Sequence, residues 1–282
     1  MNVIITGASK GLGFEIAKKF VQEGHNIAIC SRNIIELIKA SKDLKEFKKN
    51  KKQVIYYKRC DISNWDNVKH FVYEIMKKFK KINVLVNNAG VYGPFGLIEE
   101  INNDKWEDAI KINLFGTFHF MKAVIPHMKE KRRGKIINLS GGGATSPLPN
   151  ISAYAASKTA IVRLTESIAL ECKKYNIDIN SIAPGLLDTR LYDEVLKAGP
   201  KKVGKEFYNK IKNQEKTPLS VGVALCDYLA SPASDGITGC LISSVWDNWY
   251  KLHEHLEELK NSDIYTLKRI VPEDRNKNWS NK

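Results

Sequence analysis

The sequence contains no run of about 20 uninterrupted apolar residues, so we expect no membrane span. Its five cysteines are scattered without CxxC spacing, which excludes a disulfide framework, and its six histidines show no ligand spacing, so we expect no metal site. We also expect no secretory leader, and the sequence shows no internal repeat and no linker rich in proline, glycine or serine. These absences predict a cytoplasmic protein from a reducing compartment.

The sequence has fewer acidic than basic residues. It contains 31 Asp and Glu and 45 Lys and Arg, which gives a net charge of +14. An excess of this size is compatible with nucleic-acid binding. The positive charge is spread along the chain, however, and its densest run, over residues 42–52, is typical of a solvated helix end and the loop after it. Arginine-rich arms with interleaved aromatic residues are missing. We therefore expect no nucleic-acid partner, and steeply salt-dependent retention of DNA or RNA would favour that alternative.

Short apolar runs alternate with longer amphipathic stretches through most of the chain. Uninterrupted runs rich in β-branched residues are typical of strands buried on both faces of a parallel sheet. Their alternation with helices predicts an α/β fold with a doubly wound parallel sheet, the Rossmann fold. The expected strands are Val3–Thr6, Asn26–Cys30, Val54–Lys58, Val84–Val86, Lys135–Leu139, Ile177–Ile182 and Gly239–Ile242, and the clearest helices are Gly13–Glu23, Trp65–Phe79, Trp106–Met128 and Tyr154–Tyr175.

Two segments depart from this alternation. Residues 186–216 form a helical insertion before the last helix and strand, and residues 246–282 form a polar extension that contains tryptophan. We interpret the chain as one domain over residues 1–245, with a helical substrate lobe at about 186–216 and a C-terminal extension over 246–282.

A glycine-rich turn joins the first predicted strand to the first predicted helix. It reads Thr6-Gly7-Ala8-Ser9-Lys10-Gly11-Leu12-Gly13. Glycines suit a sharp turn whose backbone approaches a pyrophosphate, and the helix N-terminus offers unpaired N–H groups and a positive dipole end to that anion. The position after a strand and before a helix is the context that gives such a motif its meaning. We expect a nucleotide to contact Gly7, Ser9, Lys10, Gly11, Leu12 and Gly13.

This TGxxxGxG spacing and several later motifs resemble the classical branch of the short-chain dehydrogenase/reductase family, over about residues 1–242. The resemblance implies a hydride transfer between a nicotinamide dinucleotide and a carbonyl or alcohol. It further implies that the cofactor is contacted by residues after the third strand, in the NNAG element that ends the fourth, and in a Pro-Gly segment with a following threonine. In this chain these are Asp61, Ile62, Asn88, Ala89, Gly90, Pro184, Gly185 and Thr189.

The tip of the second predicted strand bears on the choice between NAD and NADP. An acid at this tip would bind the ribose hydroxyls, whereas a cation suits a 2′-phosphate. The chain reads Cys30-Ser31-Arg32-Asn33 there, with no acid, and Lys10 in the glycine turn adds a second cation. A guanidinium can hold a phosphate with two parallel hydrogen bonds. We therefore expect NADP(H), with NAD(H) as the alternative that equal activity with NADH would favour.

A Tyr-xxx-Lys pair opens a long predicted helix at Tyr154 and Lys158, a spacing that places both side chains on one face. A free phenol has a pKa near 10, and an ammonium about 4 Å away offers roughly 4 kcal/mol at an effective dielectric near 20, enough to lower that pKa by about three. Tyr154 would then act as general acid or base. Ser140 follows a buried strand at the ligand-binding edge of the sheet and can donate to the substrate oxygen. The resemblance adds Asn113, which distorts its helix and holds a water in a proton relay.

The segments expected to line the substrate pocket are residues 141–153 and the lobe. Three glycines at 141–143 predict a loop that needs close backbone approach. The lobe carries Lys197, Lys201, Lys202, Lys205, Lys210 and Lys212, which would suit an anionic substrate but are more typical of a solvated, mobile lid. The polar extension is a departure from the family pattern, and we hypothesise that it folds over the active-site mouth or a subunit interface.

We thus expect an NADP-dependent oxidoreductase of a small-molecule carbonyl or secondary alcohol, ketone reductase-like and possibly related to sugar or acyl chemistry. The family resemblance implies a homodimer or homotetramer. One alternative is a non-catalytic NADPH-binding sensor or scaffold, which would have no need of the Ser-Tyr-Lys set. Another is an epimerase or dehydratase of the extended branch, whose glycine turn is spaced differently.

Overall fold

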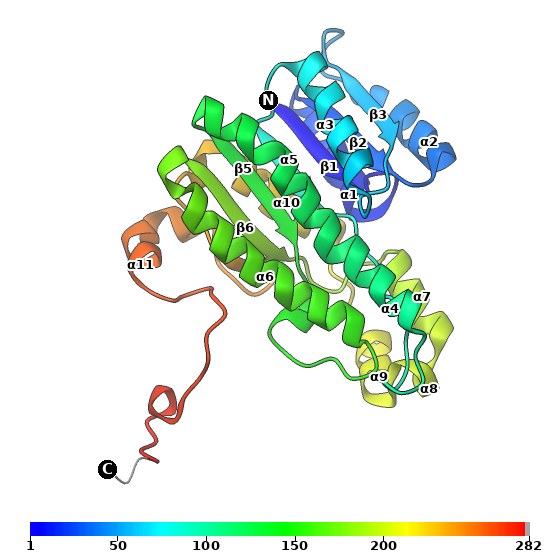
Figure 1. Ribbon diagram of the computed structural model, residues 1–282, viewed down its shortest axis with the longest axis vertical. Coiled ribbons are helices and arrows are strands. Elements are labelled where there is room, and N and C mark those ends of the chain that lie inside the picture. The colour runs from blue at the N-terminus through cyan, green and yellow to red at the C-terminus, as the bar shows by residue number, and fades with distance from the viewer. Residues whose placement is uncertain (280–282) are drawn as a thin grey trace.

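A computed structural model describes residues 1–279 as one seven-stranded sheet with helices on both faces (Figure 1). The strand order is β3-β2-β1-β4-β5-β6-β7, and every pairing is parallel. This order confirms the predicted doubly wound fold. The strands are β1 (Asn2–Thr6), β2 (Asn26–Ser31), β3 (Ile55–Arg59), β4 (Val84–Asn87), β5 (Gly134–Leu139), β6 (Ile177–Ala183) and β7 (Leu241–Ser243).

Two apolar layers hold the helices onto the sheet. Because side chains alternate along a strand, Val3 and Ile5 of β1 face one layer and Ile4 faces the other, which explains the uninterrupted apolar runs. The first layer lies under α1 (Gly11–Gln22), α2 (Ile34–Lys45) and α10 (Leu219–Ala230). The second lies under α3 (Trp65–Phe79), α5 (Gly116–Lys131) and α6 (Ser152–Cys172).

The strand order reverses between β1 and β4, and two loops that the sequence singled out meet at this point. The side-chain nitrogen of Asn88, just after β4, donates to the carbonyl oxygens of Thr6 and Gly7 at 2.9 and 3.2 Å. In open α/β sheets the ligand crevice lies outside the carboxyl ends of the strands at such a switch point. The topology therefore brings the glycine turn and the NNAG element to one edge.

The helical stretch expected around Trp106–Met128 is longer than predicted and changes its winding midway. It consists of α4 (Asn103–Ile110), a π-helical turn η1 (Lys111–Phe115) and α5. The segment after β6 contains the short helices α7 (Arg190–Ala198), α8 (Pro200–Val203) and α9 (Lys205–Asn213), which lie together below the carboxyl edge of the sheet in Figure 1. Single 3₁₀ turns lie at η2 (Gly142–Ala144), η3 (Lys173–Tyr175) and η4 (Pro232–Ser234).

The first part of the C-terminal extension packs beside the sheet, and the segment after it projects away from the body (Figure 1). It contains η5 (Trp249–His255), α11 (Leu256–Asn261) and η6 (Pro272–Arg275), and residues 280–282 of the expected extension lie outside the described part. Leu252 is buried in the first apolar layer, and the carbonyl oxygen of Tyr265 accepts from the main-chain nitrogen of Leu241 at the sheet edge. Within residues 1–279, no helix combines the length and the apolar character that crossing a bilayer requires.

Candidate active site

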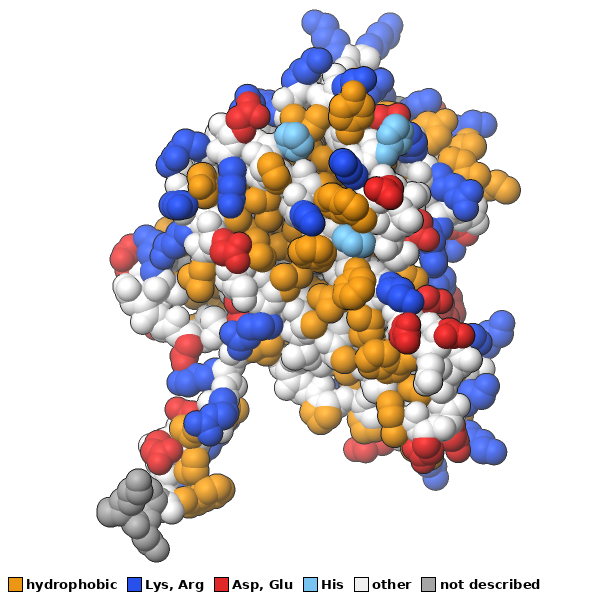
Figure 2. All heavy atoms as spheres, in the orientation of Figure 1, with side chains coloured by type: hydrophobic (Ala, Val, Ile, Leu, Met, Phe, Trp, Pro, Cys, Tyr) orange, Lys and Arg blue, Asp and Glu red, His pale blue; other side chains and the backbone are white. Residues whose placement is uncertain are grey.

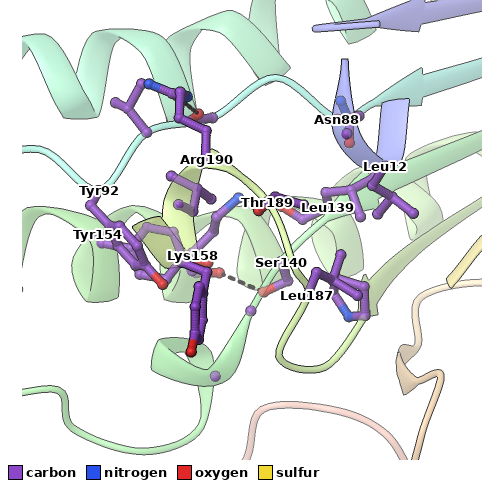
Figure 3. Close-up of a pocket in the computed structure, with 18 of the residues that line it drawn as sticks. Leu12, Asn88, Tyr92, Leu139, Ser140, Tyr154, Lys158, Leu187, Thr189 and Arg190 are labelled. Carbon is purple, nitrogen blue, oxygen red and sulfur yellow. Dashed lines mark hydrogen bonds between the residues drawn. The ribbon is translucent and has the colours of Figure 1, made fainter. Parts of the chain in front are cut away.

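A cleft of about 1180 Å³ opens along the carboxyl ends of the strands. Its lining comes from the glycine turn, the ends of β2, β4 and β5, the start of α6 and the segment between β6 and α7. Figure 3 labels lining residues from all of these parts except the end of β2. Nearly all residues proposed from sequence as site residues line it. The two that do not are Gly13 and Asn113, which are buried behind its wall.

The glycine turn is shaped by its packing against the NNAG element. A Cβ on Gly7 would lie 2.8 Å from Cα of Ala89, and a Cβ on Gly13 would overlap the side-chain nitrogen of Asn88. These two glycines therefore permit loop packing, whereas Gly11, with φ of +59°, faces the cleft. The N-terminus of α1 has no side-chain cap from the described residues and no acid in its first turn. Its free N–H groups fit a phosphate.

The tip of β2 carries Arg32, as expected, and also an acid that the sequence argument missed. Lys10 lies 2.8 Å from the carboxylate of Glu36 in the first turn of α2, and Ser9 donates to the same carboxylate at 3.4 Å. The Lys10 ammonium lowers the pKa of Glu36. All four residues line the cleft. Both expected cations are therefore present at this end, but Lys10 is paired with an acid that the sequence argument did not foresee.

Asp61 and Ile62 follow β3 at the cleft wall. The carboxylate of Asp61 accepts hydrogen bonds from the main-chain nitrogen and the hydroxyl of Ser63, at 3.0 and 2.7 Å. Ile62 is buried, and its carbonyl oxygen lies 3.0 Å from a ring nitrogen of His119. The carboxylate is thus held in a fixed position at the edge where an adenine ring is expected.

Tyr154 lies in the first turn of α6 with its ring against the ring of Tyr92, at 4.7 Å between centroids. Its hydroxyl points at the main chain of Gly141, where a Cβ would overlap the hydroxyl oxygen. A Cβ on Gly143 would lie 2.8 Å from Cα of Ala155, whereas one on Gly142 would meet nothing within 4 Å. The predicted close backbone approach therefore occurs at two of the three glycines.

Lys158 and Ser140 lie beside this phenol, as Figure 3 shows. The ammonium of Lys158 donates to the carbonyl oxygen of Leu139 at 2.6 Å and lies 5.5 Å from the ring centroid of Tyr154. The hydroxyl of Ser140 makes a long hydrogen bond of 3.3 Å to the carbonyl oxygen of Lys158. Three polar groups thus converge where β5 ends.

The pKa values of this pair do not move as the sequence argument expected. Burial raises the pKa of Tyr154 well above 10, with the nearby phenol of Tyr92 acting in the same direction. Burial also lowers the pKa of Lys158 from 10.5 to about 8. The net lowering of the phenol pKa that the sequence argument expected is therefore wrong for this geometry, in which burial outweighs the effect of the ammonium. Desolvation dominates, because it disfavours the charged form of both groups.

Asn113 lies at the centre of the π-helical turn, fully buried. Its amide nitrogen donates to the carbonyl oxygen of Val91 and to the hydroxyl of Ser157, and its amide oxygen accepts from the main-chain nitrogen of Val91, all at 2.9 Å. The hydroxyl of Thr117 donates to its carbonyl oxygen at 2.8 Å. The helix distortion predicted at Asn113 is thus present, and π-turns of this kind are frequent at functional sites.

A sequence profile for the family described as "short chain dehydrogenase" matches residues 1–199. The chain belongs to the short-chain dehydrogenase family. This short-chain dehydrogenase is 36% identical over 245 residues to "Dehydrogenase/reductase SDR family member 4" of Caenorhabditis elegans, which covers 85% of this chain and 91% of that protein. It is also 32% identical to "3-oxoacyl-[acyl-carrier-protein] reductase FabG" of Staphylococcus aureus (strain Mu50 / ATCC 700699), over 68% of this chain and 76% of that protein.

Solved structures of similar fold include one titled as NAD+-bound xylitol dehydrogenase, with a TM-score of 0.77, 28% identity and coverage of 86% of this chain and 96% of that chain. Another is an actinorhodin polyketide ketoreductase variant with NADPH, with a TM-score of 0.78, 25% identity and coverage of 86% and 94%. This short-chain dehydrogenase is therefore an oxidoreductase of alcohol or carbonyl groups that uses a nicotinamide dinucleotide.

Several lining residues of the short-chain dehydrogenase cleft were missed from sequence. Besides Glu36, they include Tyr92 against the phenol, Arg190, whose guanidinium donates to the carbonyl oxygen of Gly90 at 3.2 Å, and Trp246, which is 79% exposed. Tyr92 follows the NNAG element by two positions, a signal that could have placed it near the site. Among residues 1–279, no three His, Cys, Asp or Glu side chains are grouped as a metal site would need.

The hypothesis that the extension folds over the active-site mouth needs correction. Of residues 246–279, only Trp246 and Asp247 line the cleft. The segment up to Leu267 follows the edge strand β7 and α6, where the main-chain nitrogen of Leu267 donates to the carboxylate of Glu166 at 2.6 Å, and the chain after it projects away from the sheet (Figure 1). Within one chain, residues 248–267 therefore pack along the sheet edge, and no residue from 248 to 279 lines the cleft.

Proposed function

We propose that this chain is an NADP(H)-dependent ketone reductase, reversible as a secondary-alcohol dehydrogenase, with Tyr154 as the proton donor. The observation that carries the proposal is the convergence of the Tyr154 hydroxyl, the Ser140 hydroxyl and the Lys158 ammonium beside the glycine turn in one cleft. A non-catalytic binding protein would have no use for three such groups at this point.

The residues present fit the cofactor. The uncapped N-terminus of α1 would hold the pyrophosphate, with contacts from Gly7, Gly11 and Leu12, and Asp61 with Ile62 would contact the adenine. Asn88, Ala89 and Gly90 would line the middle of the cofactor, while Pro184, Gly185 and Thr189 would meet the nicotinamide end. When bound, the dinucleotide supplies the hydride for reduction or accepts it in oxidation.

In reduction, the Tyr154 hydroxyl donates a proton to the carbonyl oxygen as negative charge develops there. Because burial raises its pKa, the phenol stays protonated at neutral pH, which is the form that a general acid needs. Ser140 donates a hydrogen bond to the same oxygen, and its present bond of 3.3 Å is weak enough to be exchanged for this one. In oxidation the same groups act in reverse.

Lys158 has two proposed tasks. It holds the cofactor ribose, and its charge stabilises the phenolate that remains after proton donation. Asn113 would complete the relay by holding a water near this lysine, as the family resemblance implies. In this fold its side chain already ties the π-turn to Val91 and Ser157, so we assign it the further task of fixing the helix next to the site.

The preference for NADP(H) rests on Arg32 and Lys10 at the tip of β2. Arg32 is available to a 2′-phosphate through its guanidinium. Lys10 would have to exchange the Glu36 carboxylate for the phosphate, which carries more negative charge. We therefore expect a moderate preference for NADPH over NADH rather than an exclusive one.

The remaining expectations stay predictions. The substrate is a small molecule, and the cytoplasm is the expected compartment. For the expected homodimer or homotetramer, α5 and the π-turn before it present the exposed aromatic side chains of Phe118 and Phe115, and the face shown in Figure 2 displays much apolar surface.

The proposal is tested by following NADPH oxidation with a panel of ketoacyl, sugar and alicyclic ketones. NADH serves as the alternative cofactor, and Ser140→Ala serves as a variant that keeps the phenol. We expect NADPH-dependent reduction of at least one ketone, with kcat lowered by about 100-fold in Ser140→Ala, as for loss of one oxyanion donor. A chain that binds neither cofactor, or that oxidises NADPH equally well without a ketone, would contradict the proposal.

A further inference from the structure

The wall of the cleft beyond Tyr154 is apolar. Tyr154 shares one buried cluster with side chains from the loop after Gly90, from the loop before α6 and from the lobe. Those that also line the cleft are Tyr92, Leu148, Leu186, Leu191, Tyr192, Phe207 and Ile211. Their side-chain atoms are carbon except for the hydroxyls of Tyr92 and Tyr192, so this wall offers few hydrogen-bonding partners to a ligand.

The lobe helices turn their charged residues away from this wall. On α7 and α9, Leu191, Phe207 and Ile211 face the cluster, while the lobe lysines at 197, 201, 202, 205 and 212 are exposed and do not line the cleft. Lys210 is also exposed and is the lobe lysine among these six that lines the cleft. The lysine-rich composition therefore belongs to the outer surface of the lobe, and its inner surface is the apolar stripe of an amphipathic helix pair.

Two of the charged side chains on the lobe side of the cleft, Arg190 and Asp188, are already paired. The guanidinium of Arg190 binds the carbonyl oxygen of Gly90 and the carboxylate of Glu194, at 3.2 and 2.7 Å. The carboxylate of Asp188 lies 2.9 Å from the ammonium of Lys216. A polyhydroxylated ligand would compete with these pairs for its own hydrogen bonds.

We propose that the substrate is a ketone whose carbonyl carries a bulky apolar ring system, alicyclic or aromatic, and not a sugar or other polyol. This inference rests on the proposed function. In the reaction the hydride adds to the carbonyl carbon, the Tyr154 proton adds to the oxygen, and NADPH is oxidised as the ketone becomes a secondary alcohol. The ring system packs against Leu191, Phe207 and Ile211.

The physical reason is a difference in desolvation. An apolar ring gains free energy when it leaves water for this wall. A polyol that entered the same space would leave its hydroxyl groups without partners, and unpaired buried hydroxyls are penalised heavily. An apolar pocket rejects a ligand that adds one hydroxyl by about 100-fold, and a polyol adds several, which supports an expected difference of about 100-fold or more.

The test compares trans-1-decalone with L-xylulose as substrates at saturating NADPH. We expect kcat/KM at least about 100-fold higher for decalone. A matched pair of variants places the same polar side chain on the two sides of the lobe. Leu191→Asn should lower kcat/KM for decalone by at least about tenfold, whereas Lys201→Asn on the outer surface should leave it unchanged. NADPH binding, measured by fluorescence, should be the same in all three proteins.

Equal or better reduction of L-xylulose would overturn the inference and leave the proposed function intact. NADPH binding without reduction of either ketone would overturn it as well. If neither NADPH nor NADH binds, the proposed function is contradicted, and the substrate inference is contradicted with it. If Leu191→Asn fails to fold, the comparison of the two ketones in the unaltered protein still decides.

Discussion

The ammonium nitrogen of Lys158 lies 2.6 Å from the main-chain oxygen of Leu139, the last residue of β5. This hydrogen bond joins α6 to the carboxyl edge of the sheet, next to Ser140. It also holds a lysine that is only 4% exposed, and burial lowers its pKa from 10.5 to about 8. The site therefore contains a buried lysine whose protonated form is disfavoured.

The lowered pKa of Lys158 predicts that the effect of Lys158→Met on stability depends on pH. Between pH 8 and 10.5 the unfolded state retains the lysine proton that the folded state has lost, so the stability of the unaltered protein rises with pH in this window. At pH 7 the variant avoids the cost of burying a protonated lysine, about 3 kcal/mol. It also loses the hydrogen bond to Leu139, which reduces this gain by about 1 kcal/mol. We expect the variant to be more stable at pH 7 and this advantage to shrink by pH 10.

Urea unfolding at the two pH values measures this difference, with Lys201→Met on the lobe surface as the control. An advantage of the same size at both pH values would contradict the assigned pKa.

The contact of Tyr154 with Gly141 predicts a sharp difference between two adjacent glycines. Gly141→Ala should lower kcat by about 100-fold, because its Cβ would overlap the Tyr154 hydroxyl and displace the proton donor. Gly142→Ala, whose Cβ would meet nothing within 4 Å, should retain activity. Steady-state kinetics of both variants, with NADPH affinity as a check on folding, tests this. Equal activity of the two variants would show that the hydroxyl position does not matter.

The sequence allowed the fold and the Ser-Tyr-Lys set to be predicted because both depend on local patterns. Buried parallel strands are apolar throughout, and the spacing of Tyr154 and Lys158 fixes their common helix face. The pKa directions could not be predicted, because they depend on how much water the assembled cleft excludes. Glu36 was missed for a similar reason, since it meets Lys10 only when β1 and β2 align and bring the starts of α1 and α2 together.

The course of the extension also could not be predicted from the sequence. Its polar composition gave no sign that Leu252 would enter the core or that Tyr265 would bind the edge strand β7 through its main chain. Contacts of this kind follow from tertiary packing and not from a local periodicity.

The Lys10–Glu36 pair predicts that Glu36→Gln will strengthen NADPH binding. Removing the carboxylate frees the Lys10 ammonium for the 2′-phosphate and removes a repulsive charge. Exposed pairs of this kind contribute up to about 1 kcal/mol, so we expect the Kd for NADPH to fall about fivefold while the Kd for NADH changes little. Fluorescence titration with both cofactors measures this.

The control for Glu36→Gln is Glu257→Gln, which removes a similar exposed pair, with Lys260, on the extension. An equal change in both cofactor affinities would mean that Glu36 does not act on the 2′-phosphate end.

Truncation after Leu267 should leave kinetics unchanged. No residue from 268 to 279 lines the cleft, and the shortened chain keeps the contact of Leu267 with Glu166. We expect kcat and KM within about twofold of the full chain, a difference below 0.5 kcal/mol. A larger change accompanied by a change in oligomeric state would mean that the extension reaches the site of a second subunit.

The most direct test of the account is the Tyr154→Phe variant, because it removes the donated proton and keeps the ring that packs against Tyr92. We predict that NADPH binds with unchanged affinity and that kcat for ketone reduction falls by at least about 1000-fold, within the range for loss of a general acid. Reduction by Tyr154→Phe at a rate close to that of the unaltered protein would contradict the assignment of Tyr154 as proton donor.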